Sequence, residues 1–275
     1  YEMFFDDALV ASKELEITLT GKNCGQEERA PMCGIPYHAA DSYLTKLVNK
    51  GYKVAICEQV EDPKLAKGIV KREVIRIVTP GTNLNMMSLE ESRNNYLMCI
   101  AYTEDKIGIA VVDALTGDFY VTEVSDTKKL NDEIVKFSPS EIICNDNFLV
   151  SGYSIDDLRE RLGISINKID AWHFEEDSCQ KLLCKHFKVN TLTALGVDDF
   201  MAGQIAAGAV LAYLYETQKN SLSNITHLNP YIASKYMLLD SATRRNLELT
   251  ETLREKQKKG SLLWVLDKTK PAMGA

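Results

Sequence analysis

Three consecutive β-rich runs in the middle of the chain constrain its fold more than any other feature. They cover Tyr96–Tyr102, Ile107–Asp113 and Phe119–Val124, and each is rich in β-branched or aromatic residues. Glu104-Asp105 separates the first two runs and Thr116-Gly117 separates the last two. Such short polar stretches form tight turns between neighbouring strands. We therefore expect an antiparallel three-stranded meander.

Helical patterns dominate the rest of the middle segment. Met201–Gln218 is a long Ala-rich run, and its apolar positions indicate deep burial: Ile205, Ala209, Ala212 and Leu214. Shorter patterns predict helices at 128–137, 156–162 and 178–187, and a strand at Glu141–Cys144. Strands followed by helices, with one β-α-β-like passage, resemble a ribonuclease-H-like layout. We expect residues 93–225 to form one domain of this kind.

The first segment, residues 1–80, has a mixed α/β pattern. Tyr1 begins a strand-like run, and Asp6 or Asp7 is expected to cap the helix that follows. Residues 40–48 repeat apolar side chains at helical spacing, and Gly51 stands where a helix commonly ends. Further strands are expected at 17–20, 54–57 and 74–79, the last stopped by Pro80-Gly81.

The remaining residues are expected to form a linker and a short helical segment. Residues 81–92 have no sustained period and make a linker. Residues 226–275 contain two short helical patterns, with Asp240 and Ser261 as the expected N-caps. These two helices have little chain against which to bury their apolar faces. We therefore expect both ends of the sequence to be boundaries within a longer protein.

Composition and charge exclude several classes of protein. The chain has 275 residues, of which 45% are hydrophobic and 26% charged, as in ordinary globular proteins. Membrane-spanning and export patterns are absent from the sequence, and seven scattered cysteines suit reduced thiols in a cytosol. The net charge is −7, and residues 93–225 carry 20 acidic against 12 basic residues. A phosphate-binding face is therefore expected in residues 1–80 or 226–275.

Catalytic and metal-binding patterns are weak in this sequence. Gly21-Lys22-Asn23 lacks the first glycine and the hydroxyl of a phosphate-binding loop, so no ATPase motif is present. Asp113 and Asp118 could hold divalent ions in a nuclease, or could shape the turn at Thr116-Gly117. A third group lacks a fourth metal ligand and also suits ordinary helix positions: Cys179, Cys184 and His186.

Two stretches of the first segment could meet a nucleic-acid backbone. Gly34, Pro36 and His38 precede a helix, where backbone amides can bind a phosphate or the residues can simply separate strand from helix. A basic run follows, and it can be either a solvated face or a surface presented to DNA. It contains Lys67, Lys71, Arg72 and Arg76.

Three stretches resemble the MutS family of DNA mismatch-repair proteins. They are "YEMFFDDALVASKELEITLT", "PMCGIPYHAADSYLTKLVNKGYKVAICEQVEDP" with "KGIVKREVIRIVTPGT", and "LLDSATRRNLELTETL" with "GSLLWVLDKTKPAMGA". The resemblance follows the whole chain in order, although the acidic middle matches more by layout than by motif. It implies a mismatch-recognition domain at 1–80, a ribonuclease-H-like connector at 93–225, and the start of a helical core/lever domain at 226–275.

The resemblance also assigns a role to the first two residues. The recognition motif of the family is Phe-x-Glu, in which the phenylalanine wedges beside a mispaired base and the glutamate hydrogen-bonds that base. Tyr1-Glu2 matches its last two positions, so Glu2 would be the base-contacting carboxylate. The phenylalanine would precede Tyr1. Without the resemblance, Glu2 would be interpreted as an exposed acid on an edge strand.

The function implied is recognition of mispaired or unpaired bases through the minor groove, with kinking of the duplex. The connector would transmit conformational signals and help to engage MutL. The resemblance implies no cofactor and no catalysis for this chain, since ATP, magnesium and the homodimer belong to the full-length family. It implies a cytoplasmic, nucleoid-associated protein without a membrane partner. Two alternatives are a divalent-metal nuclease centred on Asp113 and a MutS relative acting in recombination or ribosome rescue.

Overall fold

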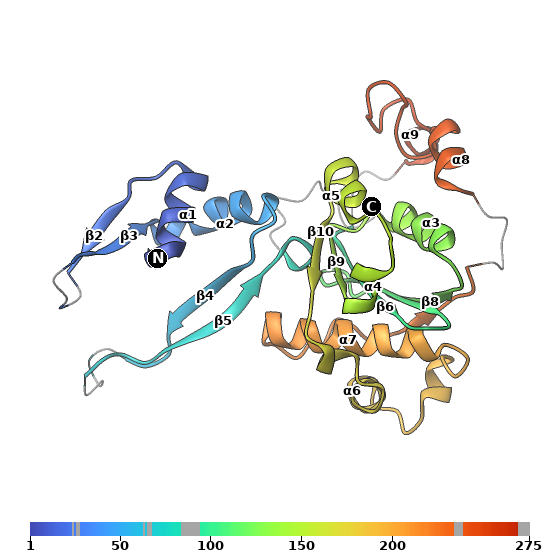
Figure 1. Cartoon of the computed structure of the whole chain (residues 1–275), viewed down its shortest axis with the longest axis horizontal. Coiled ribbons are helices and arrows are strands. Elements are labelled where there is room, and N and C mark those ends of the chain that lie inside the picture. Colours follow the sequence, from blue (N-terminus) through green and yellow to red (C-terminus); the bar gives the residue numbers. More distant parts are fainter. Residues whose placement is uncertain are drawn as a thin grey trace.

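The computed structural model describes residues 1–23, 25, 28–62, 64, 68–83, 94–233 and 239–268. Figure 1 shows a small N-terminal α/β unit, a long two-stranded hairpin, and a larger unit built on a six-stranded sheet. The mixed α/β class expected from the sequence is confirmed.

The small unit is built on a three-stranded antiparallel sheet with the order β1-β3-β2. One apolar face of α1 covers it through Ala8, Ala11 and Leu15, which pack with Cys33 and Leu47. The elements are β1 (Glu2–Phe4), α1 (Phe5–Leu15), β2 (Thr20–Lys22), β3 (Ala30–Gly34), a 3-10 turn (Tyr37–Ala39) and α2 (Ala40–Asn49). The hairpin is β4 (Val54–Gln59) and β5 (Arg72–Val78).

Two expectations for this unit were wrong. The strand expected at 17–20 lies at Thr20–Lys22, and β3 was not expected because Pro31 interrupts its short apolar run. Neither Asp6 nor Asp7 caps α1, because the chain passes directly from β1 into the helix and Phe4 is the N-cap. Both acids lie in the first helical turn, where they favourably face the positive end of the helix dipole.

The larger unit contains the expected meander. β6 (Tyr96–Tyr102), β7 (Ile107–Asp113) and β8 (Phe119–Val124) pair in antiparallel order with the predicted bounds. β9 (Glu141–Cys144) lies parallel to β6, and β10 (Ser165–Lys168) lies parallel to β9. The short β11 (Asn229–Pro230) completes the sheet order β10-β9-β6-β7-β8-β11.

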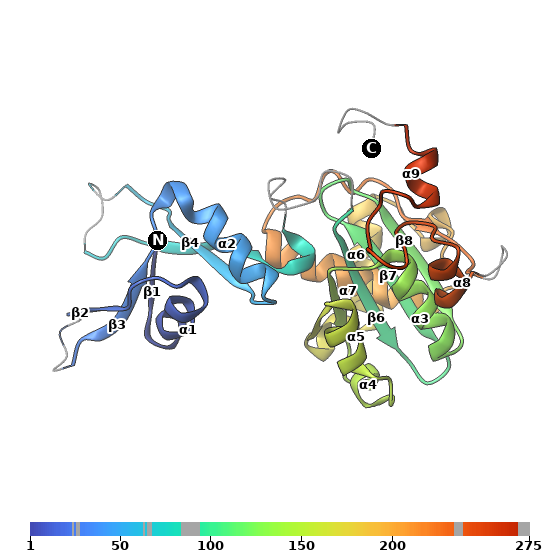
Figure 2. The same cartoon turned by 90° about the horizontal axis from the view of Figure 1, so that it is seen from above.

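Helices cover both faces of this sheet, as Figure 2 shows from above. Alternate residues of β6 point to opposite sides, so Leu97 and Cys99 join one core while Met98 and Ile100 join the other. The first core contains α6 (Glu176–Phe187) and α7 (Met201–Gln218), and the second contains α3 (Thr127–Phe137), α4 (Asp146–Val150) and α5 (Ile155–Leu162). Two 3-10 turns lie at Ala171–Phe174 and Leu192–Leu195.

Small residues let α7 approach its neighbours closely. A Cβ atom on Gly108 of β7 would lie 1.9 Å from the carbonyl oxygen of Ala202. A Cβ atom on Gly208 would lie 2.3 Å from the Cβ atom of Cys179 on α6. The expected burial of α7 is confirmed for Ala209 and Leu214, whereas Ile205 and Ala212 are only partly buried. The glycines therefore set how closely the helix packs against the sheet and α6.

The C-terminal segment forms two short helices, α8 (Ser241–Asn246) and α9 (Leu262–Leu266). The expected N-caps are confirmed. Asp240 accepts a hydrogen bond from the backbone N–H of Thr243 at 2.7 Å, and Ser261 accepts one from Trp264 at 3.2 Å.

A buried polar network joins the end of β5 to the second sheet. Glu141 of β9 is fully buried, and its carboxylate accepts from the hydroxyl of Thr79 and from the backbone N–H of Gly81 at 3.0 Å. It also accepts from Asn167 at 2.8 Å and from the hydroxyl of Tyr213 at 2.9 Å. Burial, together with the Glu141 carboxylate, raises the pKa of Tyr213.

Because of this network, the first residues of the predicted linker are buried. Pro80–Thr82 is a 3-10 turn closed by reciprocal hydrogen bonds between Thr79 and Thr82, and Gly81, Thr82 and Asn83 are buried. Glu141 and Leu97 lie directly against Gly81. Residues 81–83 are therefore packed into the larger unit. The rest of the expected linker lies outside the described residues.

Candidate nucleic-acid interface

The backbone of β1 fixes the position of Glu2. Glu2 is paired with Gly34 across β1 and β3, and Tyr1 and Ile35 exchange two hydrogen bonds at the end of the ladder. Both of those bonds measure 2.9 Å. A Cβ atom at Gly34 would lie 3.2 Å from the carbonyl oxygen of Tyr1, so the glycine allows the two strands to close here.

The carboxylate of Glu2 is exposed and paired with one lysine. Its oxygen Oε2 lies 2.8 Å from Nζ of Lys22 on β2, and the two side chains are 49% and 48% exposed. Lys22 also lies over the ring of Phe4, with Nζ 5.4 Å from the ring centroid. The hydrogen bond from Lys22 lowers the pKa of Glu2, and the charge of Arg72 adds to this effect. Glu2 therefore stays ionised to a lower pH than an isolated glutamate would.

Tyr1 points to the other side of the strand end. Its hydroxyl donates to Glu58 of β4, and this bond raises the pKa of Tyr1 to about 12. Its ring stacks on Tyr37 with centroids 5.7 Å apart and an interplanar angle of 19°. The side chain of Tyr37 is 76% exposed, so a partly stacked aromatic pair stands at the surface beside Glu2.

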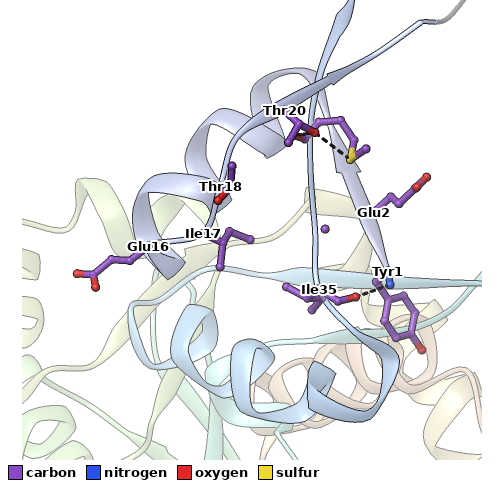
Figure 3. Close-up of a pocket in the computed structure, with 9 residues that line it drawn as sticks. Tyr1, Glu2, Glu16, Ile17, Thr18, Thr20 and Ile35 are labelled. Carbon is purple, nitrogen blue, oxygen red and sulfur yellow. Dashed lines mark hydrogen bonds between the residues drawn. The ribbon is translucent and has the colours of Figure 1, made fainter.

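An open depression of about 720 Å³ lies beside these residues. Figure 3 places Glu2 and Tyr1 on one side of it and Glu16 on the opposite side. The depression is lined by Tyr1, Glu2, Glu16, Ile17, Thr18, Thr20, Met32, Gly34 and Ile35.

The loop residues expected to face a phosphate lie between the end of β3 and the start of α2. Gly34, Pro36 and His38 are all exposed. The N-cap of α2 is Ala39, which provides no side-chain hydrogen bond, and the preceding 3-10 turn also lacks a side-chain cap. Their contact with a nucleic-acid backbone stays a prediction.

The basic run divides between two places. Lys71 and Arg72 are exposed at the start of β5, where Lys71 pairs with Glu73 at 2.5 Å. Arg76 is partly buried near the junction, donates to the carbonyl oxygen of Thr82 at 3.4 Å, and has a pKa lowered by burial. The charge of Arg72 thus helps to lower the pKa of Glu2, whereas Arg76 lies among the contacts that join the two units. Lys67 lies outside the described residues.

Comparison with protein families gives a match along most of the chain. The family model "MutS domain I" matches residues 1–86, and "MutS domain II" matches residues 95–226. The whole chain is also 66% identical to the DNA mismatch repair protein MutS of Lachnoclostridium phytofermentans, of which it covers 30%. The chain belongs to the MutS family.

Other MutS relatives show the same partial coverage. The chain is 54% identical over 277 residues to the DNA mismatch repair protein MutS of Acetivibrio thermocellus, of which it covers 32%. It is 52% identical to that of Ruminiclostridium cellulolyticum, of which it covers 31%. The chain therefore spans about a third of the length of these relatives.

The surroundings of Asp113 in the second MutS domain favour a role in a turn. This residue is 2% exposed, and its carboxylate accepts from the backbone N–H groups of Asn95, Leu115 and Thr116 at 3.1, 2.8 and 3.2 Å. Asp118 accepts from the hydroxyl of Thr116 at 3.1 Å. Across the described part of the chain, no three His, Cys, Asp or Glu side chains are grouped as a metal site would require.

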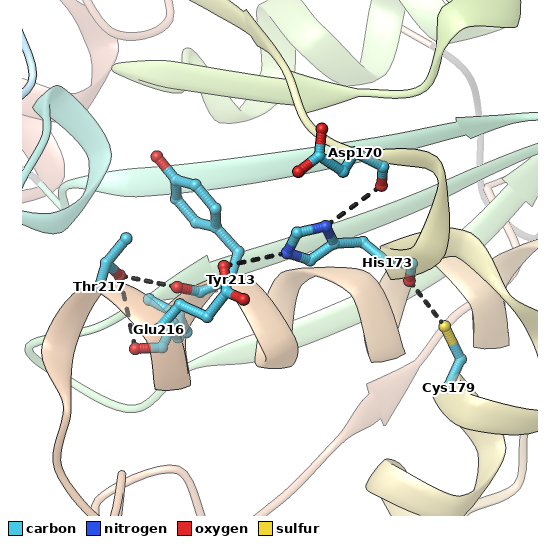
Figure 4. Close-up of polar contacts among 7 residues, drawn as sticks. Asp170, His173, Cys179, Tyr213, Glu216 and Thr217 are labelled. Carbon is cyan, nitrogen blue, oxygen red and sulfur yellow. Dashed lines mark hydrogen bonds and ion pairs between the residues drawn. The ribbon is translucent and has the colours of Figure 1, made fainter.

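A histidine and a cysteine of the connector lie close together without forming a nucleophile and base. Figure 4 shows that the thiol of Cys179 donates to the backbone oxygen of His173, at 3.1 Å, and not to its ring. The ring nitrogens of His173 lie 3.1 Å from the backbone oxygen of Asp170 and 3.1 Å from Glu216. Burial raises the pKa of Cys179 to about 12, so the thiol stays protonated.

The other two residues of the group considered as weak metal ligands occupy ordinary helix positions, as the alternative interpretation has it. His186 uses one ring nitrogen with the hydroxyl of Tyr215 at 2.7 Å and the other with the backbone oxygen of Ile225 at 2.8 Å. Cys184 lies on the same helix and is partly buried.

Within the described helices, none is long and apolar enough to cross a membrane.

Sequence reasoning missed three residues that contact Tyr1 or Glu2. Lys22, Tyr37 and Glu58 lie 20, 35 and 56 positions away along the chain and approach through β-pairing and the loop before α2. Lys22 is brought near only through β3, the strand that was not expected.

Proposed function

We propose that this chain supplies the mismatch-reading and connector parts of a MutS protein. Its first domain binds mispaired or unpaired bases through the minor groove and kinks the duplex, with Glu2 as the base-contacting carboxylate. The observation that carries the proposal is the exposed Glu2 anion at the outer end of β1, in a chain that matches MutS domains I and II.

The physics of base reading explains why a carboxylate suits this position. Kinking selects by deformability, since a mispaired step bends and unstacks at lower cost than a matched step. A carboxylate close to phosphates is repelled unless a base edge offers a hydrogen-bond donor or the acid takes up a proton. Glu2 would therefore disfavour matched DNA, and a mispaired base would compensate this repulsion.

The remaining roles of the whole protein follow from the family. We propose that the connector transmits conformational signals and helps to engage MutL, and that the full-length protein is a homodimer that uses ATP and magnesium. The chain itself would be non-enzymatic, since it has no phosphate-binding loop at Gly21-Lys22-Asn23. We place the protein in the cytoplasm, associated with the nucleoid.

The test measures affinity for homoduplex and G·T heteroduplex at one fixed salt concentration. It uses full-length MutS carrying this sequence, with the motif phenylalanine before Tyr1. Glu2→Ala should raise affinity for matched DNA and lower or leave unchanged affinity for the mispair, a loss of discrimination of about 1–3 kcal/mol. Glu2→Gln should bind both duplexes well, because it keeps a base contact and removes the repulsion. An unchanged ratio of affinities in Glu2→Ala would show that Glu2 is only an exposed strand residue.

A further inference from the structure

The ring of His173 lies between two oxygen atoms that accept hydrogen bonds. Its Nδ1 atom is 3.1 Å from the backbone oxygen of Asp170, and its Nε2 atom is 3.1 Å from a carboxylate oxygen of Glu216 on α7 (Figure 4). A neutral imidazole has one N–H donor and one bare acceptor nitrogen, whereas the imidazolium form has two donors. A neutral His173 would set a nitrogen lone pair against an oxygen lone pair. The contacts therefore fit the doubly protonated ring.

Glu216 is placed to compensate a positive charge on this ring. Its side chain is 49% exposed to water, where an ordinary glutamate is ionised at neutral pH. After burial and Glu141, its charge is also among the causes that raise the pKa of Tyr213. The side chain of His173, by contrast, is only 4% exposed, so little water is available to solvate an imidazolium. The carboxylate of Glu216 has to replace that water.

Acidic residues flank the turn that carries His173. Asp170 precedes this turn, and Glu175 and Glu176 lead from it into α6. Burial and the charges of these two glutamates raise the pKa of Cys179 to about 12, so the thiol that donates to the backbone oxygen of His173 is neutral. The surroundings of the ring on this side are therefore negative.

Two lysines near this cluster have other partners. Lys53 lies over the ring of Tyr213, with Nζ 5.3 Å from the centroid, and burial raises the pKa of that phenol so that it is neutral. Lys168 of β10 is paired with another carboxylate at 2.8 Å. Among the described residues, neither lysine forms an ion pair with Glu216. His173 is therefore the cation placed to neutralise Glu216.

An exposed indole covers one face of the ring. Trp172 is 53% exposed and stacks on His173, with centroids 3.7 Å apart and an interplanar angle of 26°. A cation over the face of a tryptophan is attracted by the negative face of the indole. The ionised histidine thus contacts Asp170, Glu216 and Trp172, and it attaches the 3-10 turn at Ala171–Phe174 to α7.

We propose that His173 carries both ring protons in the folded chain and acts as a pH-sensitive clamp, which fastens the 3-10 turn and its exposed Trp172 to α7. Loss of one proton replaces one of the two N–H···O contacts by repulsion between lone pairs. The half-exposed Glu216 then turns into water, and the turn loses this polar contact with α7. The clamp is independent of the base recognition proposed for the first domain.

Nitrogen-15 NMR of the histidine rings at pH 7.5 tests the protonation state directly. The chain has four histidines, and nuclear Overhauser contacts with the Trp172 ring assign His173. We expect an imidazolium pattern, in which the two ring nitrogens have similar shifts. His186 is the control, because its nitrogens face the Tyr215 hydroxyl, which can donate, and the backbone oxygen of Ile225. It should show one protonated nitrogen. A neutral ring at His173 would overturn the proposal.

A matched pair of variants identifies the group that holds the second proton. Glu216→Gln replaces the carboxylate by an amide that can donate to Nε2, so the ring of His173 should be neutral at pH 7.5. Glu176→Gln removes an equal charge from an exposed position on α6 and should leave the imidazolium pattern intact. An imidazolium that persists in Glu216→Gln would refute the clamp. A neutral ring in both variants would also refute it, because general acidity of the surroundings would then hold the proton.

Stability should depend on pH through the same proton. A histidine of the unfolded chain, with an ordinary pKa of about 6.5, releases as the pH rises a proton that the folded chain retains. Unfolding then releases a proton, so the unfolded state gains at higher pH. The unfolding equilibrium constant of the unsubstituted chain, divided by that of Glu216→Gln, should rise by up to about tenfold between pH 7 and pH 8. Urea denaturation measures this ratio, and equal ratios at the two pH values would overturn the clamp.

Discussion

Asp113 and Glu2 are both carboxylates at strand ends, yet their surroundings differ in burial and in hydrogen-bond partners. Asp113 is 2% exposed and accepts from three backbone N–H donors, which occupy most of the roughly four acceptor positions of a carboxylate. Glu2 has a half-exposed side chain and one flexible cationic partner. The sequence could offer both as candidates, and the backbone donors around Asp113, which only the structure shows, favour a turn role for that residue.

The role of Asp113 can be tested by substitution. Asp113→Asn should lower the free energy of unfolding by about 1.5–3 kcal/mol, since hydrogen bonds to a charged acceptor are replaced by weaker ones. Urea denaturation measures this change. Nuclease assays with magnesium or manganese should show negligible turnover on duplex, single-stranded or hybrid substrates. Turnover that disappears in Asp113→Asn would restore the nuclease interpretation.

At the scale of elements, long periodic patterns could be predicted and short interrupted ones could not. β6, β7, β8 and α7 have the bounds expected from the sequence because turns or helical composition delimit them clearly. β3 contains Pro31, and β10 has four residues with a polar end, so local pattern gave no sufficient signal. These strands form because tertiary pairing overrides local preference.

The contact of β7 with α7 gives a prediction at this scale. Gly108→Ala should lower the free energy of unfolding by about 3 kcal/mol or more, because its methyl group would collide with the backbone of Ala202 and the helix would have to move. Chemical denaturation followed by circular dichroism measures the change. A stability equal to that of the unsubstituted chain would show that α7 can shift away from the sheet at little cost.

At the scale of the whole molecule, charge governs how this chain alone meets DNA. The net charge is −7, so few phosphates would be neutralised. We expect weak binding, little mismatch preference and a shallow salt dependence in titrations of the chain against homoduplex and G·T heteroduplex. Tight, mismatch-selective binding at physiological salt would place the recognition energy within these residues alone.

The connection between the two units should be open to proteases over a limited range. From the sequence we expect the first cut within residues 81–93, and burial of Gly81, Thr82 and Asn83 moves the expected site beyond residue 83. Limited proteolysis followed by mass spectrometry identifies the cut. A first cut within Tyr96–Tyr102 or the two following strands would contradict the assignment of one domain to this region.

The hydrogen bonds of Glu141 have a consequence for how the protein can be divided. Although the second family model begins at residue 95, two donors to this buried carboxylate, Thr79 and Gly81, precede that boundary. An excised piece that starts at residue 94 would leave the acid short of partners, whereas one that starts at Thr79 would carry them. The longer piece should therefore resist urea better, by about 2 kcal/mol or more. The region matched by the second family model and the region that folds stably would then have different starting points. Thr79 and Gly81 would contribute to the stability of a domain that begins after them in sequence.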